Sequence, residues 1–130
     1  MKEITPKGIR RGRGGRAISW SKILQRYQGE PMFKLVSAIV ASPVSGELFA
    51  MTSMSRLLIT DSEQFYFDDN VLSVSYDAEA QEFEFEHRTL AAKNDKKRTG
   101  EADALQTLIL FLKYKFGVLL DSKTADKTAG

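Results

Sequence analysis

Residues 7 to 16, KGIRRGRGGR, place five cationic side chains and four glycines within ten positions. Arginine donates paired hydrogen bonds to phosphate and stacks on bases, while glycine leaves the backbone free to follow a groove or a single strand. The segment therefore predicts contact with nucleic acid. The residues expected to bind phosphate in it are Arg10, Arg11, Arg13 and Arg16.

Two other interpretations of this basic arm stay open. Residues 61 to 86 contain nine acidic residues and no lysine or arginine, so the arm could lie across this acidic segment of its own chain. Charged, glycine-rich ends of chains are also often solvated and disordered, with no role of their own.

A second group of cations lies in residues 93 to 98, KNDKKR, which we expect to form a loop before the last helix. Backbone amides at a helix start can receive a phosphate together with nearby cations. If the arm, the first helix and this loop share one edge of the fold, they form a single basic stripe. The further residues predicted to bind nucleic acid are Lys22, Arg26, Lys93, Lys96, Lys97 and Arg98. Trp20 and Tyr27 could stack on bases, although their place on the apolar side of a helix favours the core.

Catalytic chemistry has few candidates in this chain. His87 is the only histidine, and its place at the end of an alternating strand favours a core or sheet-edge histidine with a satisfied hydrogen bond. Glu82, Glu84 and Glu86 share one strand face and could hold Mg²⁺ in a nuclease, but a solvated face whose charges are compensated by cations is favoured. We therefore expect a non-enzymatic protein without catalytic residues, metal or cofactor, and a metal-dependent nuclease is the minor alternative.

Length and composition predict one ordinary domain. The 130 residues are 42% hydrophobic and 28% charged, and no apolar run approaches the roughly 20 residues of a membrane span. The absence of cysteine fits a reducing compartment, so we expect a cytoplasmic protein that does not enter a membrane. The predicted division is a flexible basic arm over 1–17, an α+β domain over 18–120 and a disordered tail over 121–130.

The elements of this domain follow from its apolar patterns. Ser19 caps a short helix whose apolar stripe recurs at helical spacing, and the helix ends before Pro31. Residues 32–41 are apolar and β-branched and predict a strand, and residues 47–60 predict a second strand with a bulge or break near 53–55. Three further strands, at 64–67, 71–77 and 82–88, predict an antiparallel meander, giving a sheet of four to six strands. Alternation places one set of side chains toward the core: Leu72, Val74, Tyr76, Phe83, Phe85 and His87.

A final helix, from Glu101 to a stop at Gly117, is expected to pack on this sheet. Its stripe toward the sheet is Leu105, Leu108, Ile109, Leu112 and Phe116. Leu110 and Tyr114 point away from that stripe and Phe111 lies on its flank, so these three residues predict an interface with a second copy or another protein.

Together these features predict a small α+β protein that binds RNA or single-stranded DNA through its basic arm and basic loop, as a homodimer formed through residues 105–116. The alternative is a protein-protein adaptor or subunit that docks through its apolar last helix and its acidic sheet face.

Overall fold

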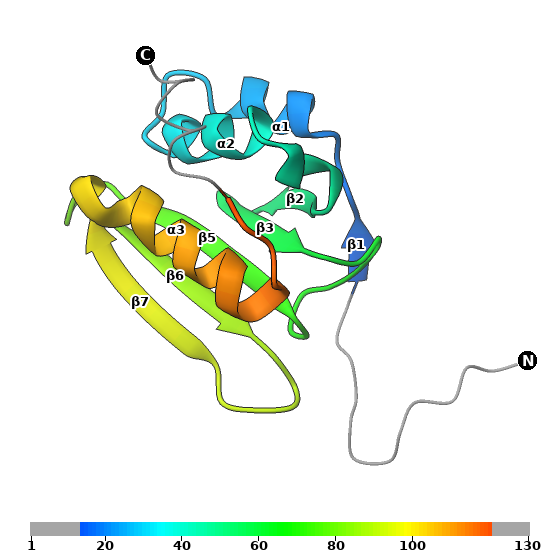
Figure 1. The fold of residues 1–130 in the computed structure, drawn as a ribbon. Coiled ribbons are helices and arrows are strands. Elements are labelled where there is room, and N and C mark those ends of the chain that lie inside the picture. Colours follow the sequence, from blue (N-terminus) through cyan, green and yellow to red (C-terminus); the bar gives the residue numbers. More distant parts are fainter. Residues whose placement is uncertain (1–13, 121–130) are drawn as a thin grey trace, which may run out of the picture.

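The computed structural model describes residues 14 to 120, which form two antiparallel sheets and three α-helices (Figure 1). The larger sheet has the strand order β2 (Phe49–Ser53), β3 (Arg56–Thr60), β5 (Val71–Asp77), β6 (Glu82–Arg88) and β7 (Asp95–Gly100). The smaller sheet pairs β1 (Gly14–Arg16) with β4 (Gln64–Tyr66). The helices are α1 (Trp20–Arg26), α2 (Met32–Val40) and α3 (Glu101–Phe116), with a short 3₁₀ helix, η1, at Pro43–Gly46. The predicted α+β class, with a C-terminal helix on an antiparallel sheet, is confirmed.

One face of the large sheet carries the main core. Val74 pairs with Phe85 and Tyr76 with Phe83 across β5 and β6, so the predicted inward-facing set shares one face. The helices contribute to the same cluster of buried side chains, including Leu108 and Leu112 of α3, whose exposed fractions are about zero. Figure 1 shows α3 lying along β5, β6 and β7, with α1 and α2 beside it.

The opposite face of the sheet is divided into an apolar part and a charged part. Near β2 and β3, a second cluster of buried side chains contains Leu58, Phe65 and Val71, and it lies under the small sheet. Toward β6 and β7 the same face carries the glutamates of β6. Between these two parts, apolar side chains lie next to arginine side chains.

The first helix follows the predicted pattern. The Ser19 side chain accepts a hydrogen bond from the Lys22 backbone N–H at 3.4 Å, and Gly29 takes a positive φ of 83° before Pro31. The last helix also ends as expected, because Gly117 has a φ of 68° and its N–H bonds to the carbonyl of Lys113.

The predicted strand at 32–41 is wrong, because these residues form α2. Met32, Leu35, Val36 and Ile39 are all buried, and their spacing is that of a single helix face. The β-branched residues favoured a strand, but the helical face packs on α1 and α3 and is buried in the main core, which overrides that preference.

The expected break near residue 54 is a hairpin turn between two strands. Met54 and Ser55 have φ values of 50° and 68°, so both central residues are left-handed, as a type I′ turn requires. The segment 47–60 therefore contributes two strands, β2 and β3, instead of one interrupted strand.

Three further expectations need correction. The residues expected as a basic loop include β7, and β4 pairs with β1 outside the predicted meander. Gly14–Arg16, expected in the flexible arm, form β1, while the predictions for residues 1–13 of the arm and for the tail at 121–130 lie outside the described residues. Among the described residues, no helix has the length and apolar character needed to cross a membrane.

Candidate nucleic-acid interface

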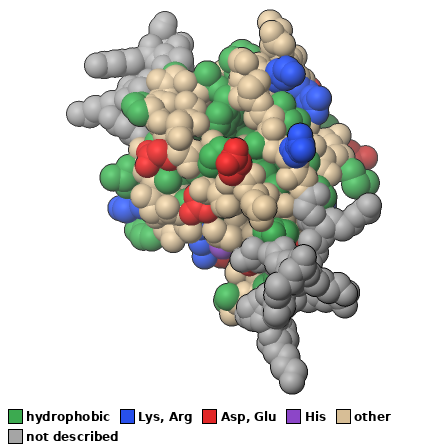
Figure 2. All heavy atoms as spheres, turned by 90° about the vertical axis from the view of Figure 1, so that its right-hand side faces the viewer, with side chains coloured by type: hydrophobic (Ala, Val, Ile, Leu, Met, Phe, Trp, Pro, Cys, Tyr) green, Lys and Arg blue, Asp and Glu red, His purple; other side chains and the backbone are tan. Residues whose placement is uncertain are grey.

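Three predicted cations lie on the side of the molecule formed by β1 and α1. Arg16 ends β1, and Lys22 and Arg26 follow on α1 four residues apart, so the two helical cations share one side. All three side chains are exposed. Arg26 donates a hydrogen bond to the Thr52 hydroxyl of β2, which joins the end of the helix to the sheet edge. Figure 2, which faces this side, shows Lys and Arg side chains gathered toward its upper right, with acidic side chains spaced across the centre.

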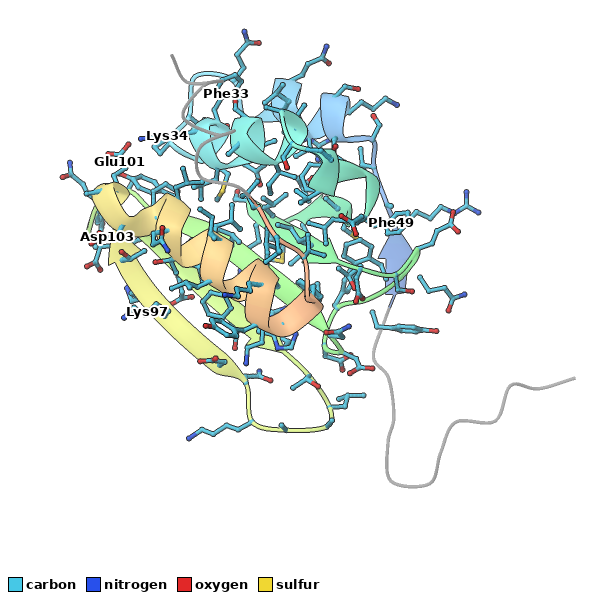
Figure 3. All side chains as sticks on the ribbon, viewed as in Figure 1. Phe33, Lys34, Phe49, Lys97, Glu101 and Asp103 are labelled. Atoms are coloured by element: carbon cyan, nitrogen blue, oxygen red, sulfur yellow. The ribbon has the colours of Figure 1, made fainter. Side chains whose placement is uncertain are left out.

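The second predicted group lies at the other end of the sheet. β7 is the strand farthest from β2 in the sheet order, and α1 packs against β2. Figure 3 shows Lys97 of β7 on one side of the fold and Phe49, at the start of β2, on the other. Among the described residues, the first helix and residues 93–98 therefore do not share one edge, so the condition for a single basic stripe is not met.

Arg98 of this second group is held by three carboxylates of β5 and β6. Its guanidinium contacts the carboxylates of Asp77 at 2.9 Å, Glu82 at 3.2 Å and Glu84 at 3.4 Å. The hydrogen bond from Arg98 lowers the pKa of the Asp77 carboxyl, and the same contact raises the pKa of Arg98. The compensating charge expected for the glutamates therefore comes from the segment that we predicted to bind phosphate.

The neighbouring cations are arranged in a similar way. Lys96 lies 4.0 Å from Glu86, whose other carboxylate oxygen contacts Arg88 at 3.1 Å. Burial raises the pKa of Glu86, but hydrogen bonding and attraction to Arg88 outweigh it, so the pKa is lowered overall. Lys93 and Lys97 are exposed.

The start of α3 is a poor place for a phosphate. Gly100 caps the helix without a side-chain hydrogen bond, and Glu101 and Asp103 lie in its first turn. These carboxylates already use the positive end of the helix dipole and repel another anion. Figure 3 shows both acidic residues at the end of the helix nearest to Lys97.

His87 is a buried histidine with a hydrogen-bond partner, as predicted. Its Nε2 lies 3.0 Å from Oδ1 of Asn70, and its ring meets Phe116 edge-on. Burial lowers the pKa of His87, and the nearby Lys115 lowers it further. Within residues 14–120, no group of three or more histidine, aspartate or glutamate side chains is arranged to hold a metal ion.

The two aromatic residues considered for base stacking belong to the core. Trp20 is half-buried and its Nε1 donates to the backbone carbonyl of Leu48 at 3.0 Å. Tyr27 is 5% exposed, and burial raises the pKa of its hydroxyl to about 12, with a further contribution from Glu30. Tyr27 therefore offers no free face to a base, and Trp20 is partly covered by the core.

A groove on the second face of the sheet contains two arginines that the sequence reasoning missed. It has a volume of about 350 Å³, and the residues that line it are Ser53, Met54, Arg56, Leu58, Phe67 and Arg88. Arg88 is fixed in place, because its Nη1 donates to the carbonyl of Phe67 at 3.2 Å and its Nε contacts Glu86. Arg56 is exposed. The sequence could have indicated an exposed arginine here, because Arg56 directly follows a turn and begins an otherwise buried strand.

β1 fixes where the Arg-rich segment joins the domain. Gly14 is paired with Tyr66, so the N-terminal end of β1 lies beside Phe67, which follows Tyr66. Gly15 allows this strand to lie close to the sheet, because a Cβ there would be 2.8 Å from Sδ of Met51 and 3.2 Å from the Phe67 ring. The groove is therefore next to the start of β1.

The predicted interface residues of α3 fall into two environments. Leu110 is 43% exposed and Tyr114 is 71% exposed. Phe111 is only 8% exposed and stacks on Phe85 with ring centroids 5.7 Å apart, so it lies in the core instead of with the other two.

Comparison of the chain with protein-family models, with curated proteins and with solved structures found no match.

Proposed function

We propose that this protein binds RNA or single-stranded DNA, without catalysis, through the Arg-rich segment and the side of the fold formed by β1 and α1. One observation carries the proposal: β1 ties the Arg-rich segment to the side that exposes Arg16, Lys22 and Arg26. A polyanion bound by the Arg-rich segment could therefore also contact these three cations, because they lie on the same side. A reducing compartment such as the cytoplasm suits a chain without cysteine, and we place the interaction there.

Charge distribution supports this choice of side. Residues 14–60 contain five lysines and arginines against two acidic residues, whereas residues 61–98 contain five against ten. The cations of β7 are largely occupied by the acidic strand beside them. The cations of the first segment attract a nucleic-acid strand. The two segments are not separate sides of the fold, because β4 pairs with β1 and Glu63 lies beside Arg16.

The test is the salt dependence of binding to a single-stranded oligonucleotide. Replacing Arg16, Lys22 and Arg26 together by Gln should weaken binding and reduce the slope of log affinity against log salt by about 2, since each lost contact to a single strand removes about 0.7. A matched control replaces Lys93 and Lys97, exposed cations on the β7 side, and should leave the slope unchanged. Equal effects of the two variants, or no binding by the parent protein at low salt, would refute the proposal.

A second candidate function, homodimer formation through α3, is favoured by the exposure of Leu110 and Tyr114. These residues lie four positions apart on one side of the helix, and both present apolar surface to solvent. We propose a second copy of the chain as the partner, with the two α3 helices in contact. Light scattering should give twice the chain mass for the parent and the single mass for the Leu110→Lys, Tyr114→Lys variant. A single mass for the parent would end this proposal and leave the adaptor alternative, with another protein on the same helix and acidic face.

A further inference from the structure

The turn between β2 and β3 carries an unusual residue for its conformation. Met54 is 93% exposed and has a φ of 50°, and Ser55 follows with a φ of 68°. Glycine and asparagine are preferred at such positions, because other L-residues are strained there. A non-glycine residue held in a strained backbone conformation is poorly explained by stability and suggests a functional role, and the full exposure of Met54 leaves its side chain free to contact a ligand.

Met54 lies at the border of the groove, which offers two kinds of surface. Its floor is apolar, formed by Leu58, which is 2% exposed, and by the half-buried ring of Phe67. Its cations are Arg56, which makes no ion pair within the described part of the chain, and Arg88, which is fixed by its contacts to Phe67 and Glu86. An apolar floor with guanidinium groups beside it fits a flat aromatic group attached to an anion.

The position of the groove identifies the source of such a ligand. Phe67 lies in the groove and also next to Gly15 of β1, so the Arg-rich segment joins the domain at one end of the groove. A single nucleic-acid strand bound by that segment can continue into the groove. An acidic peptide would satisfy the arginines equally well, but it would use the flat floor less completely than a base.

We propose that the groove receives one unpaired base of a single nucleic-acid strand, with the base on Phe67, Met54 over it, and Arg56 on the adjoining phosphate. This inference rests on the proposed function and narrows it. A base can enter the groove only when it is unpaired, so the ligand is single-stranded. The thioether of Met54 suits this position, because sulfur makes favourable contacts with aromatic rings.

The experiment compares two oligonucleotides with the same number of phosphates, a thymidine homopolymer and its abasic analogue. Stacking of one base on a protein surface is worth roughly 1–3 kcal/mol, so the full-length parent protein should bind the homopolymer at least about fivefold more tightly. Met54→Asn should reduce this preference while leaving the fold intact, because asparagine suits a positive φ. Arg56→Gln should weaken binding of both oligonucleotides and reduce the salt slope by about 0.7. Lys34→Gln, at an exposed position of α2, is the control and should change neither quantity.

The outcomes separate this inference from the function on which it depends. If the parent binds neither oligonucleotide at low salt, the proposed function fails and the inference fails with it. If both oligonucleotides bind equally well with a steep salt slope, nucleic-acid binding stands and the base-binding groove is refuted. If polyglutamate displaces the homopolymer from the parent but not from Arg56→Gln, the groove is a site for acidic peptides and the inference is also overturned.

Discussion

The β2–β3 turn should become more stable when Met54 and Ser55 are replaced by Asn and Gly. Both residues have a left-handed backbone, which costs an ordinary L-residue about 1 kcal/mol and suits asparagine and glycine. The combined relief of about 2 kcal/mol is offset by about 1 kcal/mol, because glycine gains conformational freedom in the unfolded chain. The expected net gain is about 1 kcal/mol in the free energy of unfolding.

Thermal unfolding followed by circular dichroism measures this gain. For a domain of this size, 1 kcal/mol raises the melting temperature by about 3–5 °C. The control is Glu79→Asn in the β5–β6 connection, because Glu79 is exposed and does not have a positive φ. An unchanged or lower melting temperature for the Met54→Asn, Ser55→Gly variant would show that the turn is not strained.

The same variant links stability to function. Met54 is fully exposed, so its removal takes no apolar contact away from the core. A variant that is more stable but has lost its preference for a base-containing oligonucleotide would mean that strain at this turn is retained for binding. A more stable variant with unchanged binding would remove the main reason to assign Met54 a functional role.

Three other predictions concern the core, the buried histidine and the charged face. Phe111→Ala should lower the free energy of unfolding by about 3–5 kcal/mol in urea titrations, and Leu119→Ala by less than about 1 kcal/mol, because Phe111 is buried and Leu119 is 69% exposed. The unfolded chain protonates His87 near its usual pKa of 6.5, whereas burial lowers the pKa in the folded chain, so stability should fall as the pH drops below about 6.5. Denaturant titrations at several pH values should give a smaller fall for His87→Gln. Arg98→Gln should lower the melting temperature more at low salt than at high salt, because salt screens the repulsion left among its carboxylate partners, and Lys97→Gln should show no such difference.

The parts of the fold that follow local rules could be predicted from the sequence. Alternation in 71–77 and 82–88 identified the side chains that face the core, and the observed register pairs them across two strands. Capping residues placed the start of α1 and both ends of α3 correctly, since their geometry depends on neighbouring residues only, whereas α1 ends at Arg26, before the expected cap at Gly29. These signals are independent of the rest of the chain.

The errors arose where distant contacts decide the structure. Residues 32–40 are almost entirely apolar, and in so short a run a helical and an extended pattern are both possible. Burial against α1 and the sheet selects the helix. β7 is polar along most of its length, and its formation depends on pairing with β6, which no local pattern in residues 95–100 reveals.

The candidate site was predicted only in part for the same reason. Lys22 and Arg26 are adjacent on a helix, so their common side could be foreseen. The groove combines Arg56, Phe67 and Arg88 from three segments, and only the strand order brings them together. Likewise, charge counts identified two basic segments but could not show that one of them is paired with glutamates.

Because β7 pairs with β6, part of the second basic segment neutralises acidic residues of the sheet and is not available to an anionic ligand. Arg98 and Lys96 of β7 pair with carboxylates of β5 and β6, and residues 61–98 still hold ten acidic residues against five cations. Residues 1–60 hold ten cations against three acidic residues. The basic excess is therefore concentrated in the part of the chain that contains the Arg-rich segment, α1 and the β2–β3 turn, and the proposed function places the bound polyanion there. If the proposed function is right, a nucleic-acid strand is held on the side of β1 and α1. The groove next to β1 is then the place where a base of that strand would be recognised.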